Sequence, residues 1–240
     1  MSKLSVIIPT IYKKPIVLYK LIEELDKEEV VDEIIIISNA PCIMQFPQTH
    51  KLKALEPESN AFVNMSWNIG IKHSKNDNFL LLNDDILLPP NYCKRVIDSD
   101  VFNSQNCGLI GLNPDCVIRY DKEIVDDIEA PLQDENSELI FSPLENYEGT
   151  QDWGSAIFGK KENYYFIPNC FKIYYGDNYL MYQNIVNNKI NYQVSNVLFS
   201  HIHSSSARLK EFEEIEIKDI VAWKFYKNNY IDKKQQEDNN

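Results

Sequence analysis

Glycine is scarce in this chain, with seven among 240 residues. None of them belongs to the G-x-G-x-x-G turn of a dinucleotide-binding fold or to the G-x-x-x-x-G-K-S/T loop of a P-loop protein. Both motifs hold phosphate groups on backbone N–H groups that a glycine-rich loop presents. If this protein binds a diphosphate, we therefore expect a divalent cation to replace that loop.

Paired cysteines, positive charge and long apolar runs are also lacking. The five cysteines are widely spaced and include no C-x-x-C pair, so reduced thiols are expected rather than a zinc ribbon or disulfide framework. The net charge of −12 argues against a broad nucleic-acid surface. No run approaches the ~20 apolar residues of a membrane span, and the N-terminus is typical of a strand rather than a signal peptide. We expect a soluble cytoplasmic protein that binds no nucleic acid and has no integral membrane segment.

The apolar pattern of the first half predicts an α/β fold. Short apolar or β-branched runs typical of strands occur at 4–8, 33–37, 50–55, 79–82 and 107–112. Helical spacing of apolar residues occurs at 16–29, 60–74 and 91–98. Strand, helix and strand in this order indicate right-handed βαβ units and a mostly parallel sheet.

Beyond residue 113 the pattern weakens and becomes mixed. Strand-like runs lie at 116–120, 138–141, 154–159 and 192–203, and helices are expected after Gly176 and at 218–230. We expect a single domain over 1–232, with one half at about 1–112 and a smaller, mixed half at about 113–232. The polar residues 233–240 are expected to form a disordered tail.

Two adjacent acids follow the apolar run 79–82, in the order Asn83, Asp84, Asp85. Carboxylates at the end of a buried strand lose hydration and repel each other, and a bound cation or strong hydrogen bonds would relieve this. Ligands of open α/β sheets bind beyond the carboxyl ends of the strands, where these acids would lie. Oxygen ligands favour Mg²⁺ or Mn²⁺. A plain polar turn is the alternative, because Asn and Asp are common in turns.

Four short motifs occur in a characteristic order along nearly the whole chain. They are LSVIIPT at 4–10, WNIGI at 67–71, LLNDDI at 81–86, and WGSAI at 153–157 followed by YGDNYL at 175–180. Together they resemble the family-2-like glycosyltransferases with the GT-A fold. The matching features of that family are its Pro-Thr nucleotide turn, the helix before the metal strand, the D-x-D signature, and the acceptor strand with its acidic base. The resemblance implies a Rossmann-like GT-A fold with a smaller acceptor-side half.

The resemblance also implies a role for each matching residue. Residues that would bind the donor or acceptor are Pro9, Thr10, Tyr12, Asn39, Trp67, Asn68, Asn83, Asp84, Trp153 and Gly154. Asp85 would be the main ligand of a Mn²⁺ or Mg²⁺ ion, and His201 or His203 would be a supplementary ligand. Asp177 would be the catalytic base.

Three positions differ from the family's usual pattern. Ile11 stands where a base-stacking Tyr is common, with Tyr12 beside it, Trp67 replaces an Arg, and Asn39 replaces the Asp of uracil recognition. Asn83 replaces the first acid of the D-x-D signature, a variant that resembles transferases using thymidine-linked deoxysugars. UDP-, dTDP- and GDP-linked donors, and hexosyl or deoxyhexosyl transfer, all stay open.

The implied reaction is an inverting single displacement from a nucleoside-diphosphate sugar to a hydroxyl group of a glycan or glycoconjugate. The metal would stabilise the departing diphosphate, and Asp177 would take the proton of the attacking hydroxyl. A sugar-nucleotidyltransferase is an alternative, although its Gly-rich, Arg/Lys-bearing N-terminal loop is missing. A catalytically inactive carbohydrate- or nucleotide-binding module is another.

Structural explanations compete with three of these assignments. Asp177 follows Gly176 and would also serve as a helix N-cap. His201 and His203 would lie on the same side of a strand, where they would share either a metal site or a solvated surface. Trp153 would pack into the core or stack against an acceptor sugar.

Overall fold

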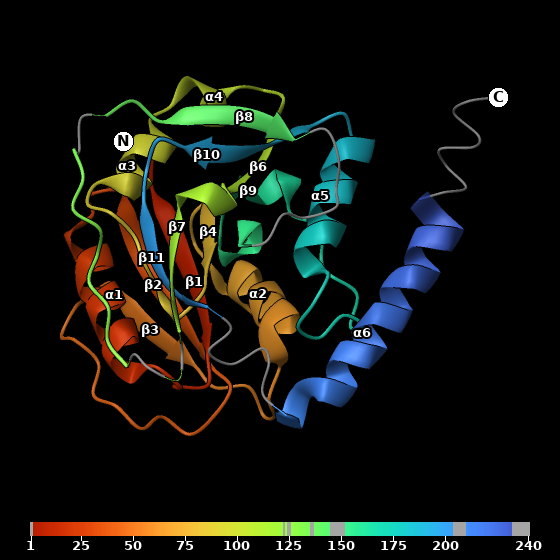
Figure 1. Cartoon of the computed structure of the whole chain (residues 1–240), viewed down its shortest axis with the longest axis horizontal. Helices are drawn as coiled ribbons and strands as arrows, with labels where there is room; N and C mark the ends of the chain where they lie inside the picture. The colour runs from red at the N-terminus through yellow and green to blue at the C-terminus, as the bar shows by residue number, and fades with distance from the viewer. Residues whose placement is uncertain are drawn as a thin grey trace.

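An eight-stranded sheet with helices on both faces runs through the protein (Figure 1). The computed structural model describes residues 2–121, 123, 126–134, 137–144, 152–203 and 210–231, without the side chains of residues 203 and 211. In spatial order the strands are β3 (Leu52–Leu55), β2 (Val31–Ser38), β1 (Leu4–Thr10), β4 (Asn78–Leu82), β9 (Ala156–Lys160), β6 (Cys107–Leu112), β10 (Ile190–Ser195) and β8 (Ile140–Leu144). Strands β3, β2, β1 and β4 run parallel, whereas β9 is antiparallel to both of its neighbours. The predicted α/β architecture with a mostly parallel central sheet is confirmed.

The helices are close to the predicted positions, apart from the short α4, which was not predicted. They are α1 (Pro15–Lys27), α2 (Phe62–His73), α3 (Tyr92–Ile97), α4 (Asp100–Asn103), α5 (Gly176–Val186) and α6 (Glu213–Tyr226), which continues into η5 (Lys227–Ile231). Pro15 suits the first turn of α1, because the N–H groups of a first turn have no partner within the helix and the one that proline lacks is not missed. Helices α1, α2 and α5 pack on the sheet, as the 3.6-residue spacing of their apolar residues indicates, whereas α6 packs on α5 and the loop before it through Trp223 and Tyr226.

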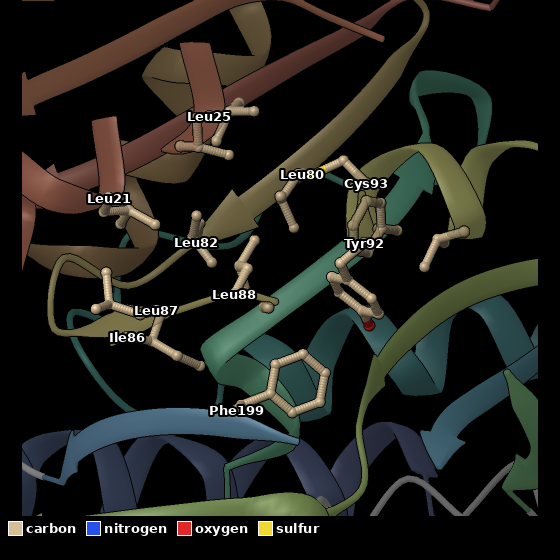
Figure 2. Close-up of a cluster of buried hydrophobic side chains, with 14 of the residues drawn as sticks. Leu21, Leu25, Leu80, Leu82, Ile86, Leu87, Leu88, Tyr92, Cys93 and Phe199 are labelled. Carbon is tan, nitrogen blue, oxygen red and sulfur yellow. The ribbon is translucent and has the colours of Figure 1, made fainter. Parts of the chain in front are cut away.

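The two faces of the sheet carry separate hydrophobic cores. Val6 and Ile8 of β1 point to the core that includes α1, whereas Ile7 points to the core that includes α2, α5 and α6. This alternation is the period-two pattern of a strand buried on both faces. Figure 2 shows the first core, where leucines of α1 and β4 meet Tyr92 of α3 and Phe199.

A second, three-stranded sheet organises the region beyond β4. It contains β5 (Ile86–Leu87), β11 (Phe199–His203) and β7 (Val117–Asp121), in that order with β11 central. His201 is paired with Ile86 on one side and with Arg119 on the other. The backbone oxygen of Asp85 accepts a hydrogen bond from the N–H group of Ile202 at 2.9 Å. This sheet therefore brings the acids after β4 next to the histidine strand.

The prediction of one strand over 192–203 is wrong. The structure has β10 in the large sheet and β11 in the small sheet, separated at Asn196, whose φ of 60° ends the extended backbone. Asn tolerates this left-handed conformation better than most residues. The side-chain amide of Asn196 also donates a hydrogen bond to the backbone oxygen of Glu138 at 2.8 Å. An apolar run alone does not reveal such a change of sheet.

Both predicted halves of the chain contribute to the large sheet, because β9 from the second half pairs with β4 and β6 from the first. The proposed tail at 233–240 lies outside the described residues. Among the described helices, none combines the length and apolarity needed to cross a membrane.

Candidate active site

A pocket opens beyond the carboxyl ends of β1 and β2 and brings together four of the predicted donor-binding residues. It is lined by Pro9, Thr10, Ile11, Asn39, Asn60, Phe62, Val63, Asp84, Ile173 and Phe212. The lining combines apolar rings and aliphatic groups with a few polar side chains, which is typical of a small-molecule site. Its position at the carboxyl ends of parallel strands is the one expected for a ligand of an open α/β sheet.

Asp84 is the acid of this pocket. Its Oδ2 atom accepts a hydrogen bond from the Thr10 hydroxyl at 2.5 Å, and the backbone N–H of Tyr12 donates to the same hydroxyl oxygen at 2.8 Å. Burial, followed by the neighbouring charge of Asp85, raises the pKa of Asp84 to about 7. A nearby positive charge would therefore stabilise the ionised form of this carboxyl group.

Asp85 points away from this pocket wall toward β11. Its Oδ1 atom lies 3.1 Å from Nε2 of His201, and both side chains are almost fully buried. The other ring nitrogen, Nδ1, lies 3.2 Å from Oδ1 of Asp152. The second oxygen of Asp152 accepts a hydrogen bond from Nε of Arg119 at 2.7 Å and lies 2.6 Å from its Nη2. Four charged groups from four segments thus form one chain, Asp85–His201–Asp152–Arg119.

The pKa values of this chain follow from burial and neighbouring charge. Burial lowers the pKa of His201, but the charges and hydrogen bonds of Asp85 and Asp152 outweigh it and raise the pKa to about 9. Burial would raise the pKa of Asp152, but His201 and Arg119 outweigh it and lower the pKa to about 2. These two shifts favour the protonated form of His201 between the two carboxylates.

The donor atoms at Asp85 and His201 fit a divalent cation. Within the described residues there is no cluster of three or more His, Cys, Asp or Glu side chains with metal-binding geometry. Mg²⁺ and Mn²⁺ are commonly held by one or two protein groups, with water and substrate phosphates completing the shell. A carboxylate oxygen and an imidazole nitrogen that converge at 3.1 Å, with a second carboxylate behind the ring, match this requirement. The side chain of His203 lies outside the described residues.

Asp177 lies at the start of α5, half-buried beside Gly154. The N-cap of this helix is Tyr175, so Asp177 is not the N-cap. Burial raises the pKa of Asp177, although its Oδ1 atom accepts a hydrogen bond from the N–H of Asn178 at 2.9 Å. A Cβ atom on Gly154 would lie 2.7 Å from Oδ2 of Asp177, so glycine leaves the space that this carboxylate occupies. The two motifs of the predicted acceptor side therefore meet.

Two predicted asparagines have their side-chain groups bound within the protein. Asn39 accepts from the N–H of Ala61 and donates to the hydroxyl of Ser66, both at 2.9 Å. Asn68 donates to the backbone oxygen of Ile167 at 2.8 Å and accepts from its N–H at 3.0 Å. Asn39 still lines the pocket, whereas Asn68 connects α2 to the loop before α5.

The predicted aromatic residues lie in the cores. Tyr12 is buried with its hydroxyl on Ser38, and Trp67 is buried on α2. Trp153 is fully buried, and its Nε1 donates to the backbone oxygen of Tyr192 at 3.0 Å. Ligand stacking by these rings stays a prediction. Asn83 stands near Ser155, with Nδ2 3.4 Å from the hydroxyl oxygen.

No family model matches the sequence, and a search of curated proteins found no match. Among solved structures, residues 1–349 of S. aureus TarS superpose with a TM-score of 0.55 and 12% identity, covering 95% of this chain and 73% of that one. The same fragment in complex with UDP gives a TM-score of 0.56, 14% identity, and coverages of 91% and 64%. A longer TarS structure gives a TM-score of 0.54 and 14% identity, and the match covers 89% of this chain and 38% of that chain.

The chain has a GT-A-like fold. Identities of 12–14% show the fold alone, and this chain spans about three-quarters or less of each TarS chain that it matches. On this fold, the pocket at Thr10 and Asp84 and the Asp85–His201 pair both lie beyond the carboxyl ends of the N-terminal strands.

Several residues around the pocket and the Asp85–His201 pair were not predicted from the sequence. Phe62 and Phe212 line the pocket from distant segments of the chain, with ring centroids 6.0 Å apart. Phe62 has a φ of 55°, which is unfavourable for a bulky residue. Of these residues, only Asp152 could have been found from the sequence, because it is an acidic residue next to the WGSAI motif. Arg119 could not, because its partner is brought near only by the small sheet.

Asp219 of α6 holds the loop that leads to Asp177. This fully buried carboxylate accepts hydrogen bonds from three successive backbone N–H groups, those of Lys172, Ile173 and Tyr174, at 2.8–3.1 Å. Ile173 of the same loop lines the pocket. Anchoring this loop through α6 therefore connects the end of the described chain to the site.

Replacement of Asp219 by alanine is expected to lower the free energy of unfolding by about 3 kcal/mol, because it leaves buried N–H groups without an acceptor. Chemical denaturation measures the change. Glu214→Ala on the same helix is the control, since that side chain is 87% exposed. Equal stability of the two variants would show that the loop does not depend on Asp219.

Proposed function

We propose that this protein is a metal-dependent inverting glycosyltransferase that moves a sugar from a nucleoside-diphosphate sugar to a hydroxyl group of a glycan or glycoconjugate. The observation that carries the proposal is the placement of Thr10, Asp84, Asp85 and His201 together at the carboxyl ends of the strands. The GT-A-like fold and the UDP bound in one TarS structure support it.

The donor would lie between the pocket and the Asp85–His201 pair. Thr10 and Asp84 would orient the ribose or the sugar, since their side chains already form a fixed hydrogen bond in the pocket wall. Asp85 and His201 would hold a Mn²⁺ or Mg²⁺ ion, which stabilises negative charge on a departing diphosphate when it is bound. A cation there would offset the repulsion between the buried acids Asp84 and Asp85, and it would bind the diphosphate in place of a glycine-rich loop.

Asp177 would accept the proton of the attacking hydroxyl. Its raised pKa makes it a better proton acceptor than an ordinary aspartate, because catalysis improves as the pKa approaches the working pH. A single base opposite the leaving group suffices for a one-step displacement, which inverts the anomeric centre. Gly154 leaves the space that this carboxylate occupies, because a Cβ atom there would lie 2.7 Å from its Oδ2 atom.

Binding of nucleotide sugars tests this proposal. UDP-, dTDP- and GDP-linked hexoses and deoxyhexoses would be added separately, each with Mn²⁺, Mg²⁺ or EDTA, and the unfolding temperature measured. We expect at least one donor to raise it in the presence of metal and to lose that effect in EDTA, because a ligand stabilises the state that binds it. Stabilisation that is equal in metal and EDTA would contradict metal dependence, and stabilisation without any turnover would favour a binding module.

A further inference from the structure

His201 is held between two carboxylates that play different parts. Nε2 faces Asp85 at 3.1 Å on the side of the proposed cation, and the other ring nitrogen, Nδ1, faces Asp152 at 3.2 Å. The Asp152 side chain is only 2% exposed, so its contacts are with protein groups rather than bulk water. The ring therefore has one nitrogen aimed at the site and one aimed at a fixed acceptor.

Cation binding by an imidazole needs a defined tautomer. If Nε2 binds a cation, that nitrogen has no proton, and the remaining proton must be on Nδ1. A carboxylate that accepts this N–H fixes the tautomer, orients the ring and makes the binding nitrogen more basic. Asp152 is placed to accept this hydrogen bond.

Arg119 fixes Asp152 in turn. Its guanidinium approaches Oδ2 of Asp152 through Nε at 2.7 Å and Nη2 at 2.6 Å, which leaves Oδ1 for His201. Arg119 and His201 are paired residues on the adjacent strands β7 and β11. Asp152 itself has a φ of 64°, a left-handed conformation that a non-glycine residue adopts at a cost and that marks a position held by its surroundings.

We propose that Asp152, held by Arg119, is a positioning residue that prepares Nε2 of His201 to bind a divalent cation. The proposal rests on the metal-dependent function proposed above, and it assigns a purpose to two residues that no sequence motif includes. Neither residue needs to touch the donor or the acceptor. Their effect passes through the orientation and tautomer of the His201 ring.

Manganese affinity of an Asp152→Asn variant tests the proposal. Free Mn²⁺ would be titrated by its electron paramagnetic resonance signal at one fixed pH, with UDP present. We expect binding to weaken by about 10–100-fold, the usual effect of losing an outer-shell partner of a metal ligand. Binding of UDP in EDTA should stay within about twofold of wild type, because Asp152 does not line the pocket.

Two further variants keep the test decisive. Arg119→Gln, whose side chain is 36% exposed, should weaken Mn²⁺ binding in the same direction and decides the matter if Asp152→Asn does not fold. Asp98→Asn removes an exposed ion pair with Lys94 and should leave Mn²⁺ affinity unchanged. Wild-type Mn²⁺ affinity in a folded Asp152→Asn protein would overturn this inference alone. Absence of Mn²⁺ binding by the wild-type protein would overturn the proposed metal dependence and this inference with it.

Discussion

Replacement of Asp177 by asparagine is expected to reduce sugar transfer by about 10²–10⁴-fold, the usual contribution of a general base. The amide has nearly the same shape as the carboxylate, so it should preserve the packing against Gly154, but it cannot take a proton. Donor affinity should change little, since Asp177 does not line the pocket at Thr10 and Asp84. Initial rates of transfer and the unfolding-temperature response to the donor measure the two effects separately.

The same variant should be more stable than the wild-type protein at pH 7. Burial raises the pKa of Asp177, so the folded state holds the proton more firmly than the unfolded chain, whose carboxyl group has a pKa of about 3.9. Such a group destabilises the fold as pH rises above that unfolded value, and asparagine removes the penalty. A higher unfolding temperature together with lost transfer would mark Asp177 as a residue kept for activity. Full transfer activity in this variant would rule it out as the base.

Replacement of Asp85 by alanine is expected to abolish the metal-dependent part of donor binding. Its Oδ1 atom is 3.1 Å from Nε2 of His201, so alanine removes the carboxylate from the proposed cation site and one of the two partners of the histidine. The loss should be at least the roughly 10–100-fold that follows removal of a residue behind a metal ligand. Calorimetric titration of UDP with Mn²⁺, and then with EDTA, separates the metal-dependent part from the rest.

Asp115→Ala is the matched control, because that acid is exposed on the turn before β7. It should bind UDP as the wild-type protein does in both conditions. If Asp85→Ala retained the full difference between Mn²⁺ and EDTA, the cation would have to bind elsewhere. His201→Gln should resemble Asp85→Ala, since it removes the other donor atom.

The mostly parallel sheet and the succession of strands and helices along the first half of the chain were predictable, because they depend on local pattern. A few consecutive residues are enough to show that β1 and β2 are buried strands, because they are β-branched runs. The 3.6-residue spacing of apolar residues likewise identifies the buried face of α1. The motifs around Thr10, Asp84 and Asp177 also lie on single short segments. The division of 192–203 into two strands was missed, because it depends on the left-handed Asn196 and on which sheet accepts the following residues.

The rest of the site depends on contacts between distant segments. Arg119, Asp152 and His201 meet only because β7 and β11 pair in a small sheet, and no spacing in the sequence encodes that meeting. In the sequence Asp219 looks like an ordinary charged residue on a helix. In the structure it is fully buried and accepts hydrogen bonds from three backbone N–H groups. Trp153 shows the converse, since its prominent motif leads to a side chain buried in the core.

Release of nucleoside diphosphate from sugar donors by the wild-type protein is the most direct measurement of the proposed chemistry. The donors would be UDP-, dTDP- and GDP-linked sugars, each incubated with Mn²⁺, Mg²⁺ or EDTA, with the Asp85→Ala variant alongside. We predict release from at least one donor with metal, none in EDTA, and none from the variant. No release and no donor-induced stabilisation with any of these donors and either metal would contradict a metal-dependent glycosyltransferase.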